Sequence, residues 1–264
     1  MDNCVLLTCL YVGAVRLSNS RSGGNRDDRH IIVRRSIAVF TVCAVSWLPT
    51  ARTCASHSSL VAALGLRSDG VLPAVATTLG LCSSLFASPL LILACESISG
   101  SETVLAKRKY ETRLVLVRNL VVAPLAEEFV FRACMVQLLF LSPPFPTWPV
   151  FSVHCCAPAC FAAAHVHHAW RRGLPGAQRN VLANTLFQFV YTFLFGAFAT
   201  ALLCRTGTLA APIAAHVFCN AMGVPSFQRL WGEAPAAFVW GVVVFSSCLH
   251  FYLRGEWRLP IADV

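Results

Sequence analysis

Long apolar segments alternate with short polar connections along the whole chain. Several of these segments approach the roughly 20 residues that an α-helix needs to cross a bilayer. They lie at approximately 3–17, 36–53, 71–95, 114–141, 148–168, 181–204, 208–223 and 236–253. The pattern predicts an all-α fold, a polytopic transmembrane bundle of about eight membrane-spanning helices.

The composition agrees with a membrane protein. Of the 264 residues, 56% are hydrophobic and only 12% are charged, whereas about a quarter of the residues of a soluble domain are charged. A soluble fold of this size could not hide so much apolar surface, so lipid is the expected solvent. The 13 cysteines form no C-x-x-C pair, which indicates free thiols rather than a disulfide framework or a zinc finger.

The net charge of +9 comes from basic residues in three connections, near residues 16–35, 107–113 and 171–179. With eight spans, all three connections fall on one face of the membrane. The positive-inside rule makes that face cytoplasmic and places both termini opposite. No recognition motif for nucleic acid accompanies the charge, so nucleic-acid binding is not expected. The first apolar run lacks a basic leader and a cleavage site, which favours an anchor over a cleaved signal peptide.

Two adjacent carboxylates, Glu127 and Glu128, lie deep inside the segment 114–141. A carboxylate at the bilayer centre costs about 2.5–3.5 kcal/mol on insertion scales, so two together require a reason. Glu128 and Arg132 are four residues apart, share a helix face and can pair. Glu127 points about 100° away and is predicted to face another helix. For Glu128 and Arg132, an ion pair that only locks helix packing is the alternative.

Two further segments carry polar residues in apolar surroundings. His165 follows three alanines, which permit close helix contact, and it can accept a proton or bind a metal. His216 and Asn220 share one face of the next-to-last segment, and both can donate hydrogen bonds. Two neutral donors aimed at one point can stabilise an oxyanion by about 2.7–4 kcal/mol each. A polar clamp between helices explains His216 and Asn220 equally well.

Together these residues suggest hydrolysis by activated water. In this hypothesis Glu127 and His165 take the proton of the water, and His216 with Asn220 hold the oxyanion. No cofactor or metal is expected. One alternative is a zinc metallopeptidase with Glu127, His165 and His216 as ligands, although H-E-x-x-H is absent. Another is a proton-coupled transporter or a non-catalytic scaffold, although no inverted repeat is visible.

The order of the motifs resembles a known family. The motifs are Glu127-Glu128-x-x-x-Arg132, Phe161-x-x-x-His165 and His216-x-x-x-Asn220. They resemble the CAAX prenyl protease 2 family, the type II CAAX prenyl endopeptidases of the ABI group of membrane peptidases. The longer stretches 164–169, 184–192 and 205–223 resemble its eukaryotic branch. On this basis we divide one membrane domain into N-terminal helices (1–110), a catalytic core (111–225) and a last helix with a tail (226–264).

The resemblance implies an intramembrane endopeptidase of the endoplasmic reticulum membrane. Such enzymes remove the C-terminal aaX tripeptide from farnesylated or geranylgeranylated CAAX proteins, typically Ras-type small GTPases. The family pattern assigns Glu127 and His165 to water activation and His216 with Asn220 to the oxyanion. Glu128 and Arg132 support the site. The implied partners are prenylated proteins and the lipid bilayer, and no metal is implied.

Overall fold

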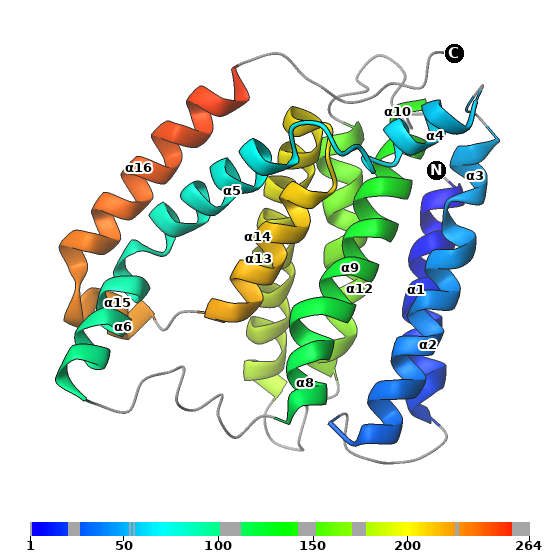
Figure 1. Cartoon of the computed structure of the whole chain (residues 1–264). Coiled ribbons are helices and arrows are strands. Elements are labelled where there is room, and N and C mark those ends of the chain that lie inside the picture. The colour runs from blue at the N-terminus through cyan, green and yellow to red at the C-terminus, as the bar shows by residue number, and fades with distance from the viewer. Residues whose placement is uncertain are drawn as a thin grey trace.

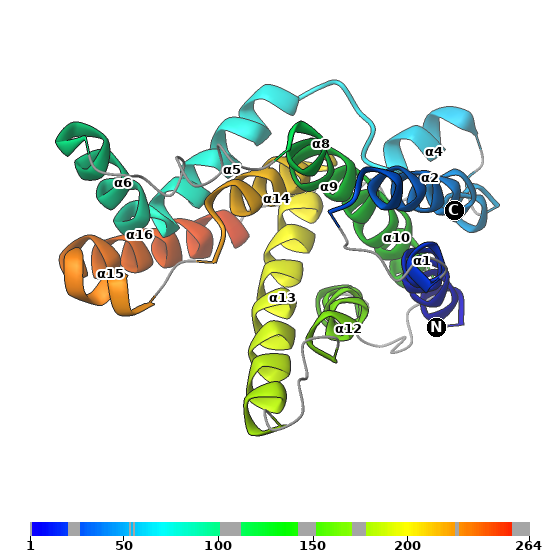
Figure 2. The same cartoon turned by 90° about the horizontal axis from the view of Figure 1, so that it is seen from below.

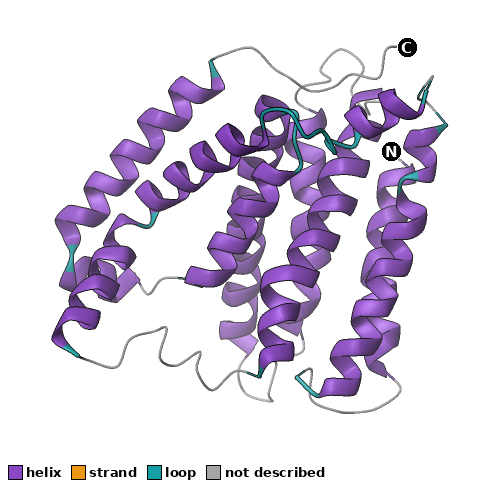
Figure 3. Ribbon diagram, in the orientation of Figure 1, coloured by secondary structure: helices purple, strands orange, loops and turns teal. Residues whose placement is uncertain are grey.

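The computed structural model describes residues 2–20, 27–52, 54, 56–100, 112–141, 152–170, 178–224 and 227–254. Within these ranges every secondary-structure element is helical, which confirms the predicted all-α class (Figures 1 and 3). The elements are α1 (Asp2–Ser20), α2 (Arg29–Ser46), α3 (Leu48–Ala51), α4 (His57–Ala63), α5 (Val71–Leu85), α6 (Ala87–Ser99), α8 (Arg113–Val117), η2 (Arg118–Val122), α9 (Ala123–Glu128), η3 (Phe129–Cys134), α10 (Met135–Leu141), η4 (Ser152–Cys156), α12 (Ala157–Trp170), α13 (Gln178–Thr206), α14 (Ala210–Met222), α15 (Phe227–Glu233) and α16 (Pro235–Leu253). The three η elements are π-helical.

Each of the eight apolar segments predicted from the sequence contains a helix. Among the described residues, three helices are long and apolar enough to cross a membrane alone: Arg29–Ala51, Val181–Thr206 and Pro235–Leu253. The pair α5 and α6 passes the same test together, although its axis bends by 78°. The stretch 113–141 carries the two glutamates and several arginines, which lower its hydropathy. Eight crossings therefore stay a prediction.

Two helix boundaries differ from those predicted. α2 begins at Arg29 rather than near residue 36, because its first two turns carry basic residues that the hydropathy pattern reads as a loop. The segment 71–95 is not one rod, since α5 ends at Leu85 and α6 begins at Ala87. Pro89 lies in the first turn of α6. A proline ring clashes with the carbonyl four residues earlier, so a straight helix cannot continue through this point.

The stretch from α8 to α10 forms the centre of the bundle. In Figure 2, α1 and α2 lie to one side of it, and α6, α15 and α16 lie at the opposite edge. α1 pairs with α2, α12 with α13, and α14 with α5. Residues Val130 to Val136 are buried all around the helix, as expected for a helix enclosed by others.

Two π-helical segments, η2 and η3, flank the short helix α9, which carries both glutamates. The N–H of Ala123 bonds to the carbonyl of Arg118, five residues earlier. Pro124 follows and cannot donate a backbone hydrogen bond. The wider turn of η2 thus carries the helix through the proline. Single π-turns inside α-helices occur frequently at functional sites.

The helix ends that flank the three basic connections lie at one end of the bundle. The end of α1 and the start of α2, the end of α6 and the start of α8, and the end of α12 and the start of α13 all lie at the bottom of Figure 1. Residues 21–26, 101–111 and 171–177 of these connections lie outside the described residues. The cytoplasmic assignment of this end stays a prediction from the positive-inside rule.

Close packing of α16 on α5 depends on Gly241. A Cβ atom at this position would overlap the backbone carbonyl oxygen of Ser84 and lie 3.1 Å from Cβ of Ala87. We expect Gly241→Ala to lower the free energy of unfolding by about 1–3 kcal/mol, the usual effect of overpacking. Denaturant or thermal unfolding in detergent measures this change.

Gly80 of α5 provides the matched control. A Cβ atom there meets nothing within 4 Å. Gly80→Ala should therefore raise the stability by about 0.5–1 kcal/mol, because alanine loses less backbone entropy in a helix. If both alanine variants were stabilised alike, the result would contradict the close packing of α16 on α5 at Gly241.

Candidate active site

Glu127 and Glu128 leave α9 in different directions. Glu128 is fully buried, and its Oε2 lies 3.1 Å from Nε of Arg132. This contact confirms the predicted pair at i and i+4. The Glu127 side chain is 14% exposed and lines a cavity of about 130 Å³. One carboxylate is therefore enclosed by protein, and its neighbour faces open space.

Arg132 is a buried cation with mostly aromatic surroundings. Its Cζ lies 4.0 Å from the ring centroid of Phe161 and 5.8 Å from that of Phe195. Nη1 and Nη2 have no hydrogen-bond partner among the described residues, so the aromatic faces take the place of oxygen partners. Gly196 of α13 permits close contact with α12, because a Cβ there would lie 3.1 Å from Cα and Cβ of Pro158, while its 3.5 Å distance to Nη2 would be an ordinary contact. Stability alone seldom selects a buried ion pair, so this arrangement points to a role in the site.

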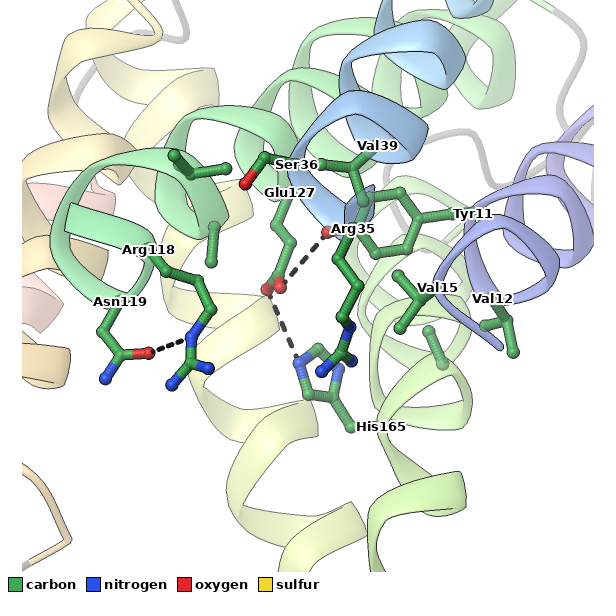
Figure 4. A pocket seen from close by; sticks show the side chains of 13 residues that line it. Tyr11, Val12, Val15, Arg35, Ser36, Val39, Arg118, Asn119, Glu127 and His165 are labelled. Atoms are coloured by element: carbon green, nitrogen blue, oxygen red, sulfur yellow. Dashed lines mark hydrogen bonds and ion pairs between the residues drawn. The ribbon is translucent and has the colours of Figure 1, made fainter. Parts of the chain in front are cut away.

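His165 reaches Glu127 from α12, as predicted. Its Nε2 lies 3.5 Å from Oε2 of Glu127, and its Nδ1 lies 2.8 Å from the carbonyl oxygen of Phe161. A carbonyl only accepts hydrogen bonds, so Nδ1 carries the proton and Nε2 of the neutral ring has a lone pair. Nε2 and the carboxylate, whose contact is the dashed line between Glu127 and His165 in Figure 4, are then both acceptors. Such a pair is suited to share a proton, or to bind from one side a water molecule that donates to both atoms.

His216 of α14 connects the two glutamates. Its Nδ1 lies 2.6 Å from Oε1 of Glu128, and its Nε2 lies 3.9 Å from Oε2 of Glu127. Because the carboxylate of Glu128 only accepts, Nδ1 of His216 donates to it. Nε2 can then donate to an oxyanion only when the imidazole carries a second proton. The sequence suggested a neutral donor here, and this geometry requires a cationic one.

Asn220 lies one turn after His216 on α14. Its Nδ2 donates to the backbone carbonyl of Asn119 at 2.9 Å. Asn119 belongs to η2 and lines the same cavity as Glu127. This bond is the clamp between helices that the sequence offered as an alternative. A role of Asn220 at the oxyanion stays a prediction.

Three side chains of the site were missed by the sequence reasoning. Tyr11 of α1 donates from its hydroxyl to Oε1 of Glu127 at 3.3 Å, and its ring packs edge-on against Phe131. Arg35 of α2 and Arg118 of η2 line the cavity with Glu127 (Figure 4). A tyrosine in an apolar helix usually packs, and arginines near a helix start resemble a loop. Nothing in the sequence pattern distinguished these three residues from packing or loop residues.

The metal alternative can be compared with the side-chain arrangement. Within the part of the chain that the structure describes, no three His, Cys, Asp or Glu side chains are placed to bind one metal ion. The alternative named Glu127, His165 and His216 as zinc ligands. His216 directs Nδ1 to Glu128 and its Nε2 toward Glu127. A metal-bound histidine also commonly donates its other ring nitrogen to a carboxylate, so sensitivity to chelators, and not ring orientation, distinguishes the zinc set.

Comparison with known proteins agrees with the motifs. The family model described as "Type II CAAX prenyl endopeptidase Rce1-like" matches residues 110–222. CAAX prenyl protease 2 of Homo sapiens is 35% identical over 243 residues, which are 85% of this chain and 70% of that protein. The Rattus norvegicus protein of that name is 32% identical over 85% of this chain and 68% of its own length.

A plant relative matches a shorter part of the chain. CAAX prenyl protease 2 of Arabidopsis thaliana is 41% identical over 132 residues, which are 48% of this chain and 41% of that protein. No solved structure matches the chain. The matched range 110–222 contains all three sequence motifs, and the human relative aligns over most of both chains. These matches show that the chain belongs to the type II CAAX prenyl endopeptidase family.

Proposed function

We propose that this endopeptidase cleaves the peptide bond after the prenylated cysteine of a CAAX box, with a water molecule that donates hydrogen bonds to both Glu127 and His165. The observation that carries this proposal is the 3.5 Å separation of Glu127 Oε2 and His165 Nε2 at the wall of a cavity. A water molecule there has two acceptors for its protons. General-base catalysis requires such a contact with the proton that is removed.

The proposed reaction uses both glutamates. The water oxygen attacks the scissile carbonyl carbon while its proton passes to the Glu127–His165 pair. The carbonyl oxygen becomes an oxyanion, which the imidazolium of His216 stabilises from Nε2 while Glu128 holds Nδ1. Asn220 is the second proposed donor, one turn away on the same helix. The carbon–nitrogen bond then breaks, and the pair returns the proton to the amine of the leaving tripeptide.

An apolar groove beside the cavity supports a prenylated substrate. The groove has a volume of about 560 Å³ and lies between α2 and the α8–η2 stretch. It shares Ser36, Arg118 and Val122 with the cavity that holds Glu127. Its other lining residues are Ile32, Val33, Ile37, Phe40, Thr41, Ala44, Leu114 and Val117. An isoprenoid chain favours apolar surface, whereas hydrolysis of a peptide bond needs water. Here the apolar groove adjoins the cavity that holds the polar side chains.

The proposed substrates are farnesylated or geranylgeranylated CAAX proteins of the Ras type of small GTPases. The proposed location is the endoplasmic reticulum membrane, in which the chain crosses several times. Family membership speaks against the alternative of a transporter or scaffold. Zinc dependence differs from the proposed mechanism in one measurable property, sensitivity to chelators.

The test is release of the tripeptide from a farnesylated Cys-a-a-X peptide by the purified protein, followed by mass spectrometry. We expect release that a zinc chelator does not reduce, and much slower release from the same peptide without its prenyl group. Inhibition by the chelator that added zinc reverses would replace the water mechanism with a metal mechanism. A well-folded protein that releases no tripeptide would contradict the proposed function.

A further inference from the structure

We infer that Arg35 and Arg118 form the binding site for the C-terminal carboxylate of the substrate peptide. The inference rests on the proposed function and adds to it the group that sets the position of cleavage. Arg35 comes from α2 and Arg118 from η2, and both line the cavity with Glu127 and His165. In Figure 4 both guanidinium groups lie below the carboxylate of Glu127, on the side away from its backbone.

The chemistry of the reaction calls for such a site. An enzyme that removes three residues from a chain end must distinguish that end from an internal segment. The α-carboxylate is the group that only the end possesses, and it is ionised at neutral pH. A carboxylate brought into a bundle that sits in lipid needs a cation, because an unpaired charge is costly there. Arginine binds carboxylates through two parallel N–H donors.

The spacing along the central helix fits a tripeptide. Arg118 precedes Glu127 by nine residues (127 − 118) on one continuous helical stretch. At a rise of about 1.5 Å per residue, their Cα atoms lie about 13 Å apart along the axis. Three extended residues span about 10 Å, and the arginine side chain can cover the remainder. A scissile bond at Glu127 would therefore place the peptide end near Arg118.

The surroundings of Arg118 orient its guanidinium. Its Nη1 lies 2.8 Å from Oδ1 of Asp27, and its Nε donates to Oδ1 of Asn119 at 3.0 Å. The Arg118 side chain is only 11% exposed, whereas that of Asp27 is 48% exposed. A guanidinium has five N–H donors and can bind two carboxylates from different directions. The competing explanation is that Arg118 only ties η2 to the start of α2.

A pair of matched peptides tests the inference. One is a farnesylated Cys-a-a-X peptide with a free carboxylate, and the other ends in the neutral carboxamide. We expect the wild-type protein to cleave the acid with a kcat/KM about 10- to 100-fold higher, the usual effect of a charge-assisted hydrogen bond. In Arg118→Gln and in Arg35→Gln this ratio should fall toward one.

Asp27→Asn separates binding from packing. It removes the ion pair of Arg118 but keeps the guanidinium, so the preference for the acid should persist. If Arg118 acts only in packing, Asp27→Asn and Arg118→Gln will slow both peptides by equal factors and leave the ratio unchanged. A wild-type protein that cleaves both peptides equally overturns the carboxylate site alone. One that cleaves neither overturns the proposed function as well.

Discussion

Glu127→Gln is expected to lower the rate of tripeptide release by about 10²–10⁴-fold, the range that a positioned general base contributes. Glutamine has nearly the same shape, but its amide cannot take a proton from water. The hydroxyl of Tyr11, which lies 3.3 Å from Oε1 of Glu127, can still donate to the amide oxygen. The loss should therefore come without unfolding, and single-turnover cleavage of a farnesylated peptide measures it.

The control for this variant is a carboxylate far from the cavity. Glu233 of α15 pairs with Arg229 on the surface. The Glu233→Gln variant should therefore cleave the farnesylated peptide at the wild-type rate. His165→Ala should reduce the rate in the same direction as Glu127→Gln, because it removes the other acceptor for the water protons. Near-normal cleavage by Glu127→Gln would mean that the base lies elsewhere.

Arg132→Met should produce the largest loss of stability, about 3–5 kcal/mol, as is usual when one partner of a buried ion pair is removed. Glu128 would remain fully buried with a charge. His216 would still bind Oε1 at 2.6 Å, but Oε2 would lose the Nε of Arg132. Thermal unfolding in detergent, compared with wild type, measures the effect.

Two further variants show whether the effect comes from the buried charge. Replacing both partners, Glu128→Gln with Arg132→Met, should restore most of the stability, since no unpaired charge remains. Activity should stay low, because the amide holds His216 less firmly. Arg229→Met, which breaks a partly exposed pair with Glu96 and Glu233, should change stability far less than Arg132→Met, because water screens an exposed ion pair. Equal losses in Arg132→Met and Arg229→Met would refute the argument from burial.

Much of the helical arrangement could be read from the sequence, since apolar length and spacing are local properties. The contact between Glu128 and Arg132 could also be predicted, because residues four positions apart on a helix are neighbours in any fold. The widening of the helix at η2 and η3 could not, because a π-turn depends on how surrounding helices pack. The bend after Leu85 was missed as well, although Pro89 marked it.

Contacts between distant segments lay beyond the sequence pattern. Tyr11 and Glu127 are 116 positions apart, and no periodicity relates α1 to α9. The division at residue 110 therefore describes where motifs occur and not where the site ends, since Tyr11 and Arg35 come from the N-terminal part. His216 was foreseen as a member of the site. Its attachment to Glu128 was not, because only the packing of α14 decides which carboxylate it meets.

The pairing of Glu128 with Arg132 also bears on how the chain is made. A ribosome completes α9 and η3 well before His216, which lies 88 positions after Glu128. During that interval the two charges neutralise each other within one turn of helix, so this segment can enter lipid before its distant partner exists. His216 is synthesised only with α14, and its contact with Glu128 completes the active site. A nascent chain thus has no assembled protease site until most of its helices are in place.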